Sequence, residues 1–279
     1  MNHPPLFKAL TISGSDSSAA DGIQADLKTF ASLGVYGSSV VTAVTAQNTV
    51  EVTAIAEVPD EVLIAQIDTV IEDVGAHAAK VGMLSGKSIV ENTADRLEAW
   101  GIPHLVLDPV MVSKSGAPLL QLTAMRALVN ELIPLCTIIT PSIAEAATLI
   151  KKEISTATDA EEAAKAIHEM GADIVVIKGG HVPGSAVDLV YADGQFTPIE
   201  GERTGTHATH GTGATFSAAI TAFLAMGIDP MEAIRLAKRY IENALRHSLP
   251  IGEGYLPVNH FAPLSDEIAS AIASATNVG

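Results

Sequence analysis

Cysteine, aromatic residues and basic residues are all scarce in this chain. Its one cysteine, Cys136, excludes an internal disulfide and predicts a reducing compartment. Aromatic residues make up 4%, so the core must rest on Val, Ile, Leu and Ala. Lys and Arg number 16 against 32 Asp and Glu, and the resulting net charge of −16 opposes binding to a phosphate backbone. We therefore expect no nucleic-acid partner.

Long apolar runs are also missing. No stretch approaches the roughly 18 uninterrupted apolar residues that a membrane-spanning helix needs. The first residues lack the basic start and apolar stretch of a signal peptide, so we expect a cytoplasmic protein without a membrane partner. Hydrophobic residues nevertheless reach 48% and charged residues 17%, which indicates a sizeable folded core rather than disorder.

Short β-branched runs alternate with longer amphipathic segments along most of the chain. The short runs predict buried strands at residues 9–12, 40–44, 78–83, 105–110, 137–139 and 174–177. Helical periodicity predicts helices at residues 61–74, 88–100, 123–132 and 160–170. This alternation implies βαβ units and a mainly parallel sheet with helices on both faces.

The pattern changes late in the chain. Residues 187–191 and 195–199, joined by Asp193 and Gly194, predict a tight hairpin and hence antiparallel strands at one edge of the sheet. Two helices, one over 215–226 and one opened by Asp229 and Pro230, are expected to close the chain. Without a linker or repeat, we expect one domain over residues 1–279.

Four segments carry residue types that plain structure does not require, and three of them follow predicted strands, whose carboxyl ends gather at one edge of the sheet. Gly211, Thr212 and Gly213, here called the glycine turn, precede an apolar helix. Glycines let the backbone approach an anion, and a helix start offers N–H groups and partial positive charge. Gly-Thr-Gly alone also occurs in ordinary turns.

The other two strand ends carry charge. Lys178, beside two glycines, could reach a phosphate or merely meet solvent. Asp108 could hold a hydrated Mg²⁺ or a nucleotide–metal complex, with Glu145 as the second carboxylate. Taken alone, Glu145 is more simply a first-turn helix residue stabilised by the helix dipole.

The fourth segment is a loop of small residues over 13–28, which could cover a small ligand. Gln47 ends the next predicted strand, at 40–44. Its amide could pair with both a donor and an acceptor on the edge of a heterocycle, or could stabilise its own turn.

These motifs together match one known pattern over nearly the whole chain and in the same order. The matching pieces are residues 22–29, 34–37, 45–49, 80–84, 108–112, 114–116, 118–120, 178–181 and 209–213. The chain thereby resembles the hydroxymethylpyrimidine/phosphomethylpyrimidine kinases of the ribokinase-like superfamily. Bacterial pyridoxal kinases share much of the pattern, although residues 46–49 and 114–116 are more similar to the pyrimidine branch.

The resemblance implies a ribokinase-like three-layer α/β/α fold. It also implies ATP-dependent phosphorylation of 4-amino-5-hydroxymethyl-2-methylpyrimidine, its monophosphate or both, in thiamine biosynthesis. The pyrimidine would lie near Gly14, Asp26, Gln47, Met83 and Val110. Homodimers are common in the family, so a homodimer is the expectation.

The resemblance further implies how the phosphoryl donor is handled. Asp108, Glu145 and Lys178 would serve Mg-ATP, with Mg²⁺ on the two carboxylates. The glycine turn would form the anion hole for the transferred phosphoryl group, and the loop after Val112 would act as a small lid. Such parts supply positioning and charge neutralisation, which phosphoryl transfer mainly requires.

The chain departs from the family pattern around the expected active site. Ala214 directly follows the glycine turn, where the family has Cys and the wider superfamily Asp as the group that activates the substrate hydroxyl. Ala19 and Ala20 replace paired glycines, and Asp21 replaces a small residue. Two further positions, where the family has Asn, carry Ser142 and Ala208.

Several interpretations of Ala214 stay open. The chain could be a natural kinase that uses another group or water, or an engineered Cys-to-Ala variant. It could also be a catalytically weakened paralogue that binds pyrimidine with little turnover. Pyridoxal or pyridoxine phosphorylation is the alternative activity.

Overall fold

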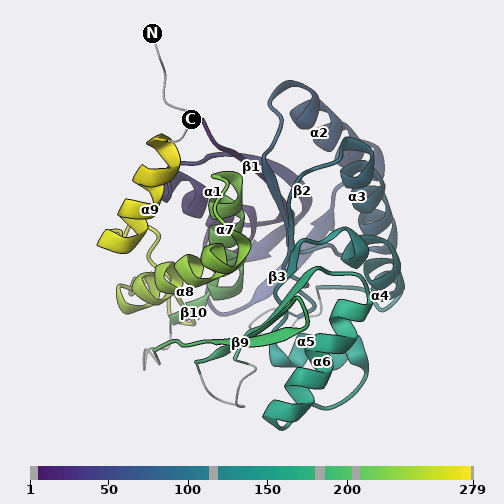
Figure 1. Cartoon of the computed structure of the whole chain (residues 1–279). Helices are drawn as coiled ribbons and strands as arrows, with labels where there is room; N and C mark the ends of the chain where they lie inside the picture. Colours follow the sequence, from purple (N-terminus) through teal and green to yellow (C-terminus); the bar gives the residue numbers. More distant parts are fainter. Residues whose placement is uncertain (1–5, 113–118, 180–185, 203–207, 278–279) are drawn as a thin grey trace.

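A central sheet lies between two layers of helices in the computed structural model of the chain, which describes residues 6–112, 119–179, 186–202 and 208–277 (Figure 1). The strands of this sheet are β1 (Lys8–Asp16), β2 (Tyr36–Gln47), β3 (Val52–Glu57), β4 (Ala78–Val81), β5 (Leu105–Leu107), β6 (Ile138–Ile139), β7 (Ile174–Ile177), β8 (Asp188–Ala192) and β9 (Gln195–Ile199). Their order across the sheet is β3-β2-β1-β4-β5-β6-β7-β8-β9. From β2 to β7 all neighbours are parallel, which confirms the predicted mainly parallel sheet.

Helices cover both faces of the sheet, as predicted. One layer contains α1 (Gly22–Ser32), α7 (Thr212–Ala225), α8 (Pro230–Arg246) and α9 (Asp266–Asn277). The other contains α2 (Asp60–Asp73), α3 (Lys87–Trp100), α4 (Ala124–Ala127), α5 (Ile143–Ile150) and α6 (Ala157–Glu169). The three-layer α/β/α arrangement is thus confirmed.

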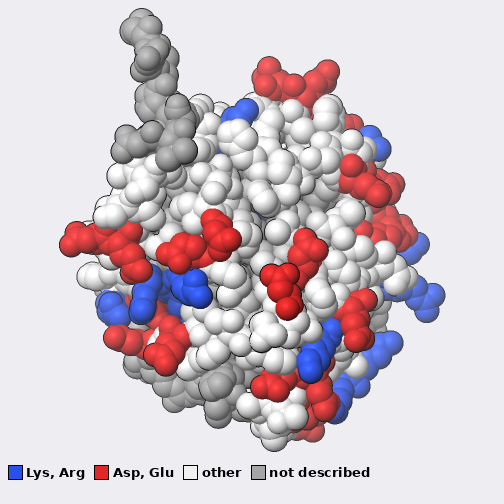
Figure 2. Space-filling view, in the orientation of Figure 1, with Lys and Arg blue, Asp and Glu red and all other residues white. Residues whose placement is uncertain are grey.

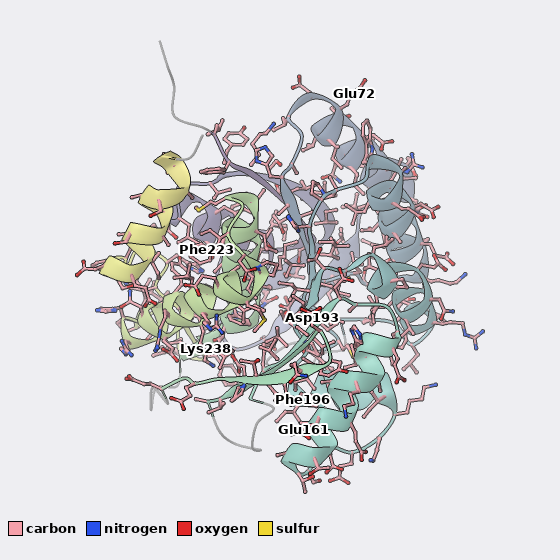
Figure 3. The ribbon with its side chains drawn as sticks, viewed as in Figure 1. Glu72, Glu161, Asp193, Phe196, Phe223 and Lys238 are labelled. Carbon is pink, nitrogen blue, oxygen red and sulfur yellow. The ribbon has the colours of Figure 1, made fainter. Side chains whose placement is uncertain are left out.

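Each layer encloses its own apolar core, because successive side chains of a strand point to opposite faces of the sheet. Leu10 and Ile12 of β1 join Leu63 of α2 in one core. Ala9 joins the other, together with Phe223 of α7, which is fully buried and labelled in Figure 3. The continuous apolar runs in the sequence therefore reflect strands buried on both faces.

Three features differ from or refine the sequence prediction. The hairpin is confirmed, because β8 and β9 are antiparallel and turn at Asp193 and Gly194, both with positive φ (Figure 3). The sequence prediction missed β3, which pairs antiparallel with β2 at the opposite edge. The helix predicted at 123–132 is only partly α-helical, since α4 ends at Ala127 and a π-helical turn follows.

The expectation that two helices close the chain is wrong. α9 follows α8 and packs on it, and between them the strand β11 (Leu256–Pro257) pairs with β10 (Ala208–His210) in a separate small sheet. α9 consists mostly of Ala, Ser and polar residues and is largely exposed, so its apolar periodicity is weak.

The strand order creates a place for a ligand. The chain runs from β1 to its neighbour β2 and later returns to the other side of β1 as β4, so the loops that follow these strands diverge there. In open parallel sheets, ligands bind at such a switch point, beyond the carboxyl ends of the strands.

The surface is acidic, in keeping with the net charge of −16. On the face in Figure 2, acidic side chains are spread widely and basic ones lie in small groups among them. Among the described residues, no helix combines the length and apolar character needed to span a membrane.

Candidate active site

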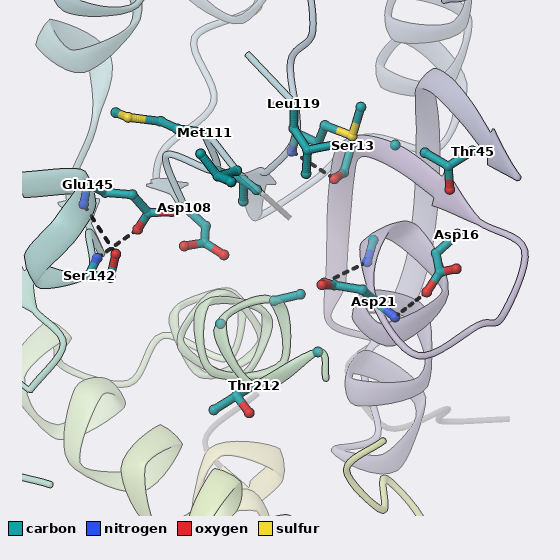
Figure 4. A pocket seen from close by; sticks show the side chains of 18 of the residues that line it. Ser13, Asp16, Asp21, Thr45, Asp108, Met111, Leu119, Ser142, Glu145 and Thr212 are labelled. Atoms are coloured by element: carbon teal, nitrogen blue, oxygen red, sulfur yellow. Dashed lines mark hydrogen bonds between the residues drawn. The ribbon is translucent and has the colours of Figure 1, made fainter. Parts of the chain in front are cut away.

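A cavity of about 500 Å³ lies at the carboxyl ends of the parallel strands. Its wall includes nearly all the site residues that the sequence predicts: Gly14, Gln47, Met83, Asp108, Val110, Glu145, Lys178, Gly211, Thr212, Gly213 and Ala214 (Figure 4). Asp26 is the exception and lies behind the wall. The expected lid, the loop after Val112, falls on residues 113–118, outside the described part of the chain.

The glycine turn opens α7 and lies at the centre of this cavity. Gly211 has a φ of 78°, and a Cβ there would clash with the carbonyl oxygen of Ala20, so both conformation and space require glycine. A Cβ on Gly213 would lie 3.3 Å from Asp108 Oδ2 and 3.3 Å from Lys178 Nζ. The first turn of a helix leaves N–H groups without intrahelical acceptors, which suits an anion.

One side of the cavity, the Lys178 wall, consists of Asp108, Ser142, Glu145 and Lys178. Lys178 Nζ donates to Asp108 Oδ1 at 2.8 Å, and the lysine side chain is 21% exposed. Burial opposes the lysine charge, but the fields of Asp108 and Glu145 outweigh it and raise the pKa of Lys178. The ammonium is therefore held charged at the cavity surface.

Glu145 has a structural role as well as a place in this wall. Ser142 N donates to Glu145 Oε2 at 2.7 Å, and Glu145 N donates to Ser142 Oγ at 3.3 Å, which forms a capping box at the start of α5. The simpler interpretation of Glu145 therefore applies in part. The same contacts hold the carboxylate at the cavity wall.

The opposite side, the Asp21 wall, consists of Gly14, Asp16, Asp21 and Gln47. The buried Asp16 carboxylate accepts hydrogen bonds from Ser18 Oγ at 2.8 Å and from the backbone N–H groups of Ala20 at 3.1 Å and Asp21 at 2.9 Å. It thereby shapes the loop before α1. Asp21 itself caps α1 through Gly22 N at 2.9 Å and keeps 39% of its side chain exposed.

His210 lies behind the Asp21 wall. Its Nε2 is 3.4 Å from Gln47 Nε2 and 3.8 Å from Asp16 Oδ2, and its Nδ1 is 3.9 Å from Asp21 Oδ2. The ring is buried, and Nδ1 has no hydrogen-bond partner among the described residues. The Gln47 amide is oriented by Thr45 Oγ1, which donates to Gln47 Oε1 at 3.2 Å.

Asp26 forms a buried ion pair beneath the cavity. Both of its carboxylate oxygens accept from Lys80 Nζ, at 2.7 and 2.8 Å, and Thr11 Oγ1 donates at 2.6 Å. Burial raises the pKa of Asp26, although Lys80 and Thr11 oppose the shift. Lys80 lines the cavity and is the nearest of the pair to a ligand. Sequence reasoning singled out Asp26 and missed Lys80 and Asp16 as cavity residues, whereas the Asp21 charge lies in the cavity wall, near where the resemblance placed it.

The carboxylates suit a magnesium ion that arrives with a nucleotide. Among the described residues, no group of three His, Cys, Asp or Glu side chains could hold a metal by itself. Mg²⁺ usually takes one or two carboxylates together with phosphate oxygens and water. Asp108 and Glu145 provide two carboxylates on one wall, beside Lys178, so the donor set fits.

Comparison with known proteins gives consistent matches over most of the chain. A family model described as phosphomethylpyrimidine kinase matches residues 16–259. The hydroxymethylpyrimidine/phosphomethylpyrimidine kinase of Haemophilus influenzae is 46% identical over 260 residues, which cover 91% of this chain and 97% of that protein.

Solved structures show the same fold. The ADP complex of Bacillus subtilis pyridoxal kinase superposes with a TM-score of 0.86 at 40% identity, covering 92% of this chain and 98% of that one. Phosphomethylpyrimidine kinase from Clostridium difficile gives 0.75 at 41% identity, covering 84% and 97%. The expected ribokinase-like fold is confirmed.

Proposed function

The chain belongs to the phosphomethylpyrimidine kinase family, and on that basis we propose that it uses ATP to phosphorylate 4-amino-5-hydroxymethyl-2-methylpyrimidine, its monophosphate or both, in thiamine biosynthesis. Membership makes it a phosphotransferase. The observation that carries the proposal is the position of the glycine turn. A Cβ on Gly213 would lie 3.3 Å from both Asp108 Oδ2 and Lys178 Nζ, and a Cβ on Gly211 would clash with Ala20 in the loop before α1. One anion site thus borders two walls that can hold two substrates.

The Lys178 wall is the side for the phosphoryl donor. Lys178 would neutralise charge on the transferred phosphoryl group, and the N–H groups at the start of α7 would bind its oxygens. Asp108 and Glu145 would hold Mg²⁺, which supplies charge neutralisation on the nucleotide phosphates when it is bound. Because Asp108 Oδ1 already accepts from Lys178, the lysine is positioned before the nucleotide arrives.

The Asp21 wall is the side for the acceptor. Gln47 offers an amide to the pyrimidine edge, and Gly14, Met83 and Val110 supply the small and apolar surface on which the ring would lie. A Cβ on Gly14 would come within 2.9 Å of Met83 Sδ, so a larger residue there would displace the methionine. Asp26 acts through Lys80, which it holds at the cavity floor.

Pyridoxal phosphorylation is the second candidate, because the Bacillus subtilis pyridoxal kinase shares the fold at a TM-score of 0.86. A weakened pyrimidine-binding paralogue is the third, because Ala214 offers only a methyl group to the cavity. Neither candidate changes the assignment of the Lys178 wall, which would bind the nucleotide whether the acceptor is a pyrimidine or pyridoxal.

A steady-state assay of ADP release separates these candidates. The purified chain is incubated with ATP, Mg²⁺ and the hydroxymethylpyrimidine, its monophosphate or pyridoxal, and the products are identified by mass. We expect the highest kcat/KM with one of the two pyrimidines. A higher kcat/KM with pyridoxal would replace the proposal by the second candidate. Tight pyrimidine binding in calorimetry without any product would replace it by the third.

We also propose a single kinase domain over residues 1–279, working as a homodimer in the cytoplasm without a nucleic-acid partner. ATP use, the single cysteine and the net charge of −16 support the compartment and the absence of nucleic acid. The family resemblance supports the dimer. Sedimentation of the full chain measures the oligomeric state, and a monomer at assay concentration would exclude the dimer.

A further inference from the structure

The acceptor hydroxyl must lose its proton when it attacks the phosphoryl group, and Ala214 cannot take it. Ala214 is buried at the start of α7 and presents only carbon atoms there. Another protonatable side chain of the cavity wall could serve. Among the described residues, the charged side chains in that wall are Asp16, Asp21, Lys80, Asp108, Glu145 and Lys178.

The three charged groups of the Lys178 wall are already engaged. Asp108 accepts from Lys178 Nζ at 2.8 Å, and Glu145 is held by Ser142 N at 2.7 Å in the capping box. These groups also lie on the side that the nucleotide phosphates would occupy.

Two of the three remaining groups are engaged as well. Lys80 Nζ is bound to both oxygens of the buried Asp26 and is an ammonium, which has no lone pair to accept a proton. Asp16 is buried and accepts hydrogen bonds from Ser18 and from the backbone of Ala20 and Asp21.

Asp21 differs from all of these. Among the described residues, its carboxylate accepts one hydrogen bond, from Gly22 N to Oδ1 at 2.9 Å, and its side chain is 39% exposed within the cavity wall. The Asp21 Cα lies 3.7 Å from where a Cβ on Gly211 would stand, so this residue abuts the glycine turn. Figure 4 shows Asp21 and Asp108 on either side of the start of α7.

We propose that Asp21 is the general base of this kinase and takes the role that Ala214 cannot fill. The proposal rests on the proposed function. The acceptor O–H proton passes to an Asp21 carboxylate oxygen while the hydroxyl oxygen forms a bond to the γ-phosphorus. The bond from that phosphorus to the bridging oxygen breaks, and ADP leaves with the electron pair. The buried His210 ring places its Nδ1 3.9 Å from Asp21 Oδ2.

The two proposed acceptors make different demands on such a base. A hydroxymethyl group needs a proton acceptor, whereas a phosphate monoester is already largely ionised near pH 7, since its second pKa is about 6. A fixed carboxylate would also repel a phosphate acceptor. Asp21 should therefore promote phosphorylation of the alcohol. It should either have no effect on phosphorylation of the monophosphate or slow it.

Asp21 is also the N-cap of α1, so the test must keep the cap and remove the base. Asp21→Asn does this, because Asn caps a helix as well as Asp but does not accept the proton. We expect kcat for the hydroxymethylpyrimidine to fall about 10²- to 10⁴-fold, the usual effect of losing a positioned base. We expect kcat/KM for the monophosphate to stay within a few-fold or rise.

Two further variants complete the experiment. Asp229→Asn removes the charge of a matched N-cap, at the start of α8 and outside the cavity wall, and is expected to leave both activities unchanged. Ala214→Asp in the Asp21→Asn background places a carboxylate directly after the glycine turn. This second change should restore part of the lost kcat for the alcohol. Asp21→Ser, which also keeps a capping side chain, replaces Asp21→Asn if the latter does not fold.

The outcomes are distinct. If Asp21→Asn leaves kcat for the alcohol unchanged, the proposal is overturned. It is also overturned if Asp21→Asn lowers kcat equally with both acceptors, because that would indicate a structural role. A loss confined to the alcohol supports it. If the unchanged chain phosphorylates neither pyrimidine, the proposed function fails first, before any variant is compared.

Discussion

The Lys178 wall and the Asp21 wall border the same glycine turn but hold their charges in different ways. On the first, a cation and a carboxylate pair at 2.8 Å in the cavity itself. Next to the second, Lys80 and Asp26 form a buried pair, and the Asp21 carboxylate accepts one hydrogen bond among the described residues, from Gly22 N. A preformed ion pair suits a charged nucleotide, whereas a lightly held carboxylate suits proton transfer. The chain departs from its family's pattern on both walls, at Ser142 on the first and at Asp21 on the second, and also at Ala214.

The two walls differ most in the buried ion pair of Lys80 and Asp26, and Lys80→Met removes this pair. Asp26 would remain fully buried without its cation, which typically costs about 3–5 kcal/mol of stability. We expect that loss in urea unfolding at pH 7.5. It should shrink at pH 5, because the buried carboxyl binds its proton more tightly in the folded than in the unfolded chain, so protonation favours the fold.

Lys87→Met is the matched control for that variant, because Lys87 forms an exposed pair with Glu91 on α3. Exposed pairs contribute roughly 0–1 kcal/mol. A Lys80→Met chain as stable as the control would mean that Asp26 does not need Lys80. The buried Lys80–Asp26 pair would then contribute no more to the free energy of unfolding than an exposed pair does.

Lys178→Met tests the first wall directly. Loss of one group that stabilises transition-state charge commonly lowers kcat about 10²- to 10³-fold. Because Lys178 acts on the transferred phosphoryl group, we expect equal losses with the alcohol and the monophosphate, in contrast to Asp21→Asn. Lys152→Met, at a surface lysine paired with Glu162, is the control and should keep full activity. A loss with only one acceptor would contradict the assignment of the two walls.

The sequence was informative about the Lys178 wall because strand ends and glycines mark it. Asp108, Lys178 and the glycine turn each follow a strand or open a helix, so their convergence follows from the parallel sheet. The edge strand β3 was missed for a physical reason: nearly all its residues are exposed, and a strand without a buried face gives little apolar signal.

The Asp21 wall could not be predicted in the same way. Asp26 and Lys80 are 54 residues apart, and nothing in the local pattern says that one is buried against the other. In the sequence, Asp21 stands out only as a charge near the expected active site, where the family has a small residue. Only the approach of Gly211 to Ala20 places it beside the start of α7. Residue types were thus sufficient to predict that Asp108, Lys178 and the glycine turn converge, while the position of Asp21 beside the start of α7 depended on tertiary contacts.

His260 supports the element that both walls share. Its Nε2 lies 2.9 Å from Thr215 Oγ1 on α7, and burial, together with the charge of Lys28, lowers its pKa to about 4. The unfolded chain binds the proton near pH 6.5, so the stability that depends on a neutral His260 is lost as pH falls from about 6.5 to 4. At pH 5 the loss amounts to roughly 2 kcal/mol.

We therefore expect His260→Gln to lose less stability than the unchanged chain between pH 7.5 and pH 5, by about that amount, in urea unfolding. His247→Gln, at an exposed ring beyond α8, is the matched control and should follow the unchanged chain. Parallel curves for all three proteins would show that His260 does not titrate with folding. If the loss of the His260–Thr215 contact in His260→Gln shifts α7, the activity of this variant at pH 7.5 should fall equally with both acceptors.

Glu145→Gln gives the smallest effect and separates the two roles of Glu145. Glutamine at this position also completes a capping box, so the free energy of unfolding should stay within about 0.5 kcal/mol of the unchanged chain. The lost charge should weaken Mg²⁺ binding by about 1 kcal/mol, or roughly fivefold in the Mg²⁺ concentration for half-maximal rate. Asp159→Asn, in the capping box of α6, is the control and should not alter the Mg²⁺ dependence. A stable Glu145→Gln enzyme with an unchanged Mg²⁺ requirement would leave Glu145 as a helix cap only and Asp108 as the sole metal-binding carboxylate of the Lys178 wall.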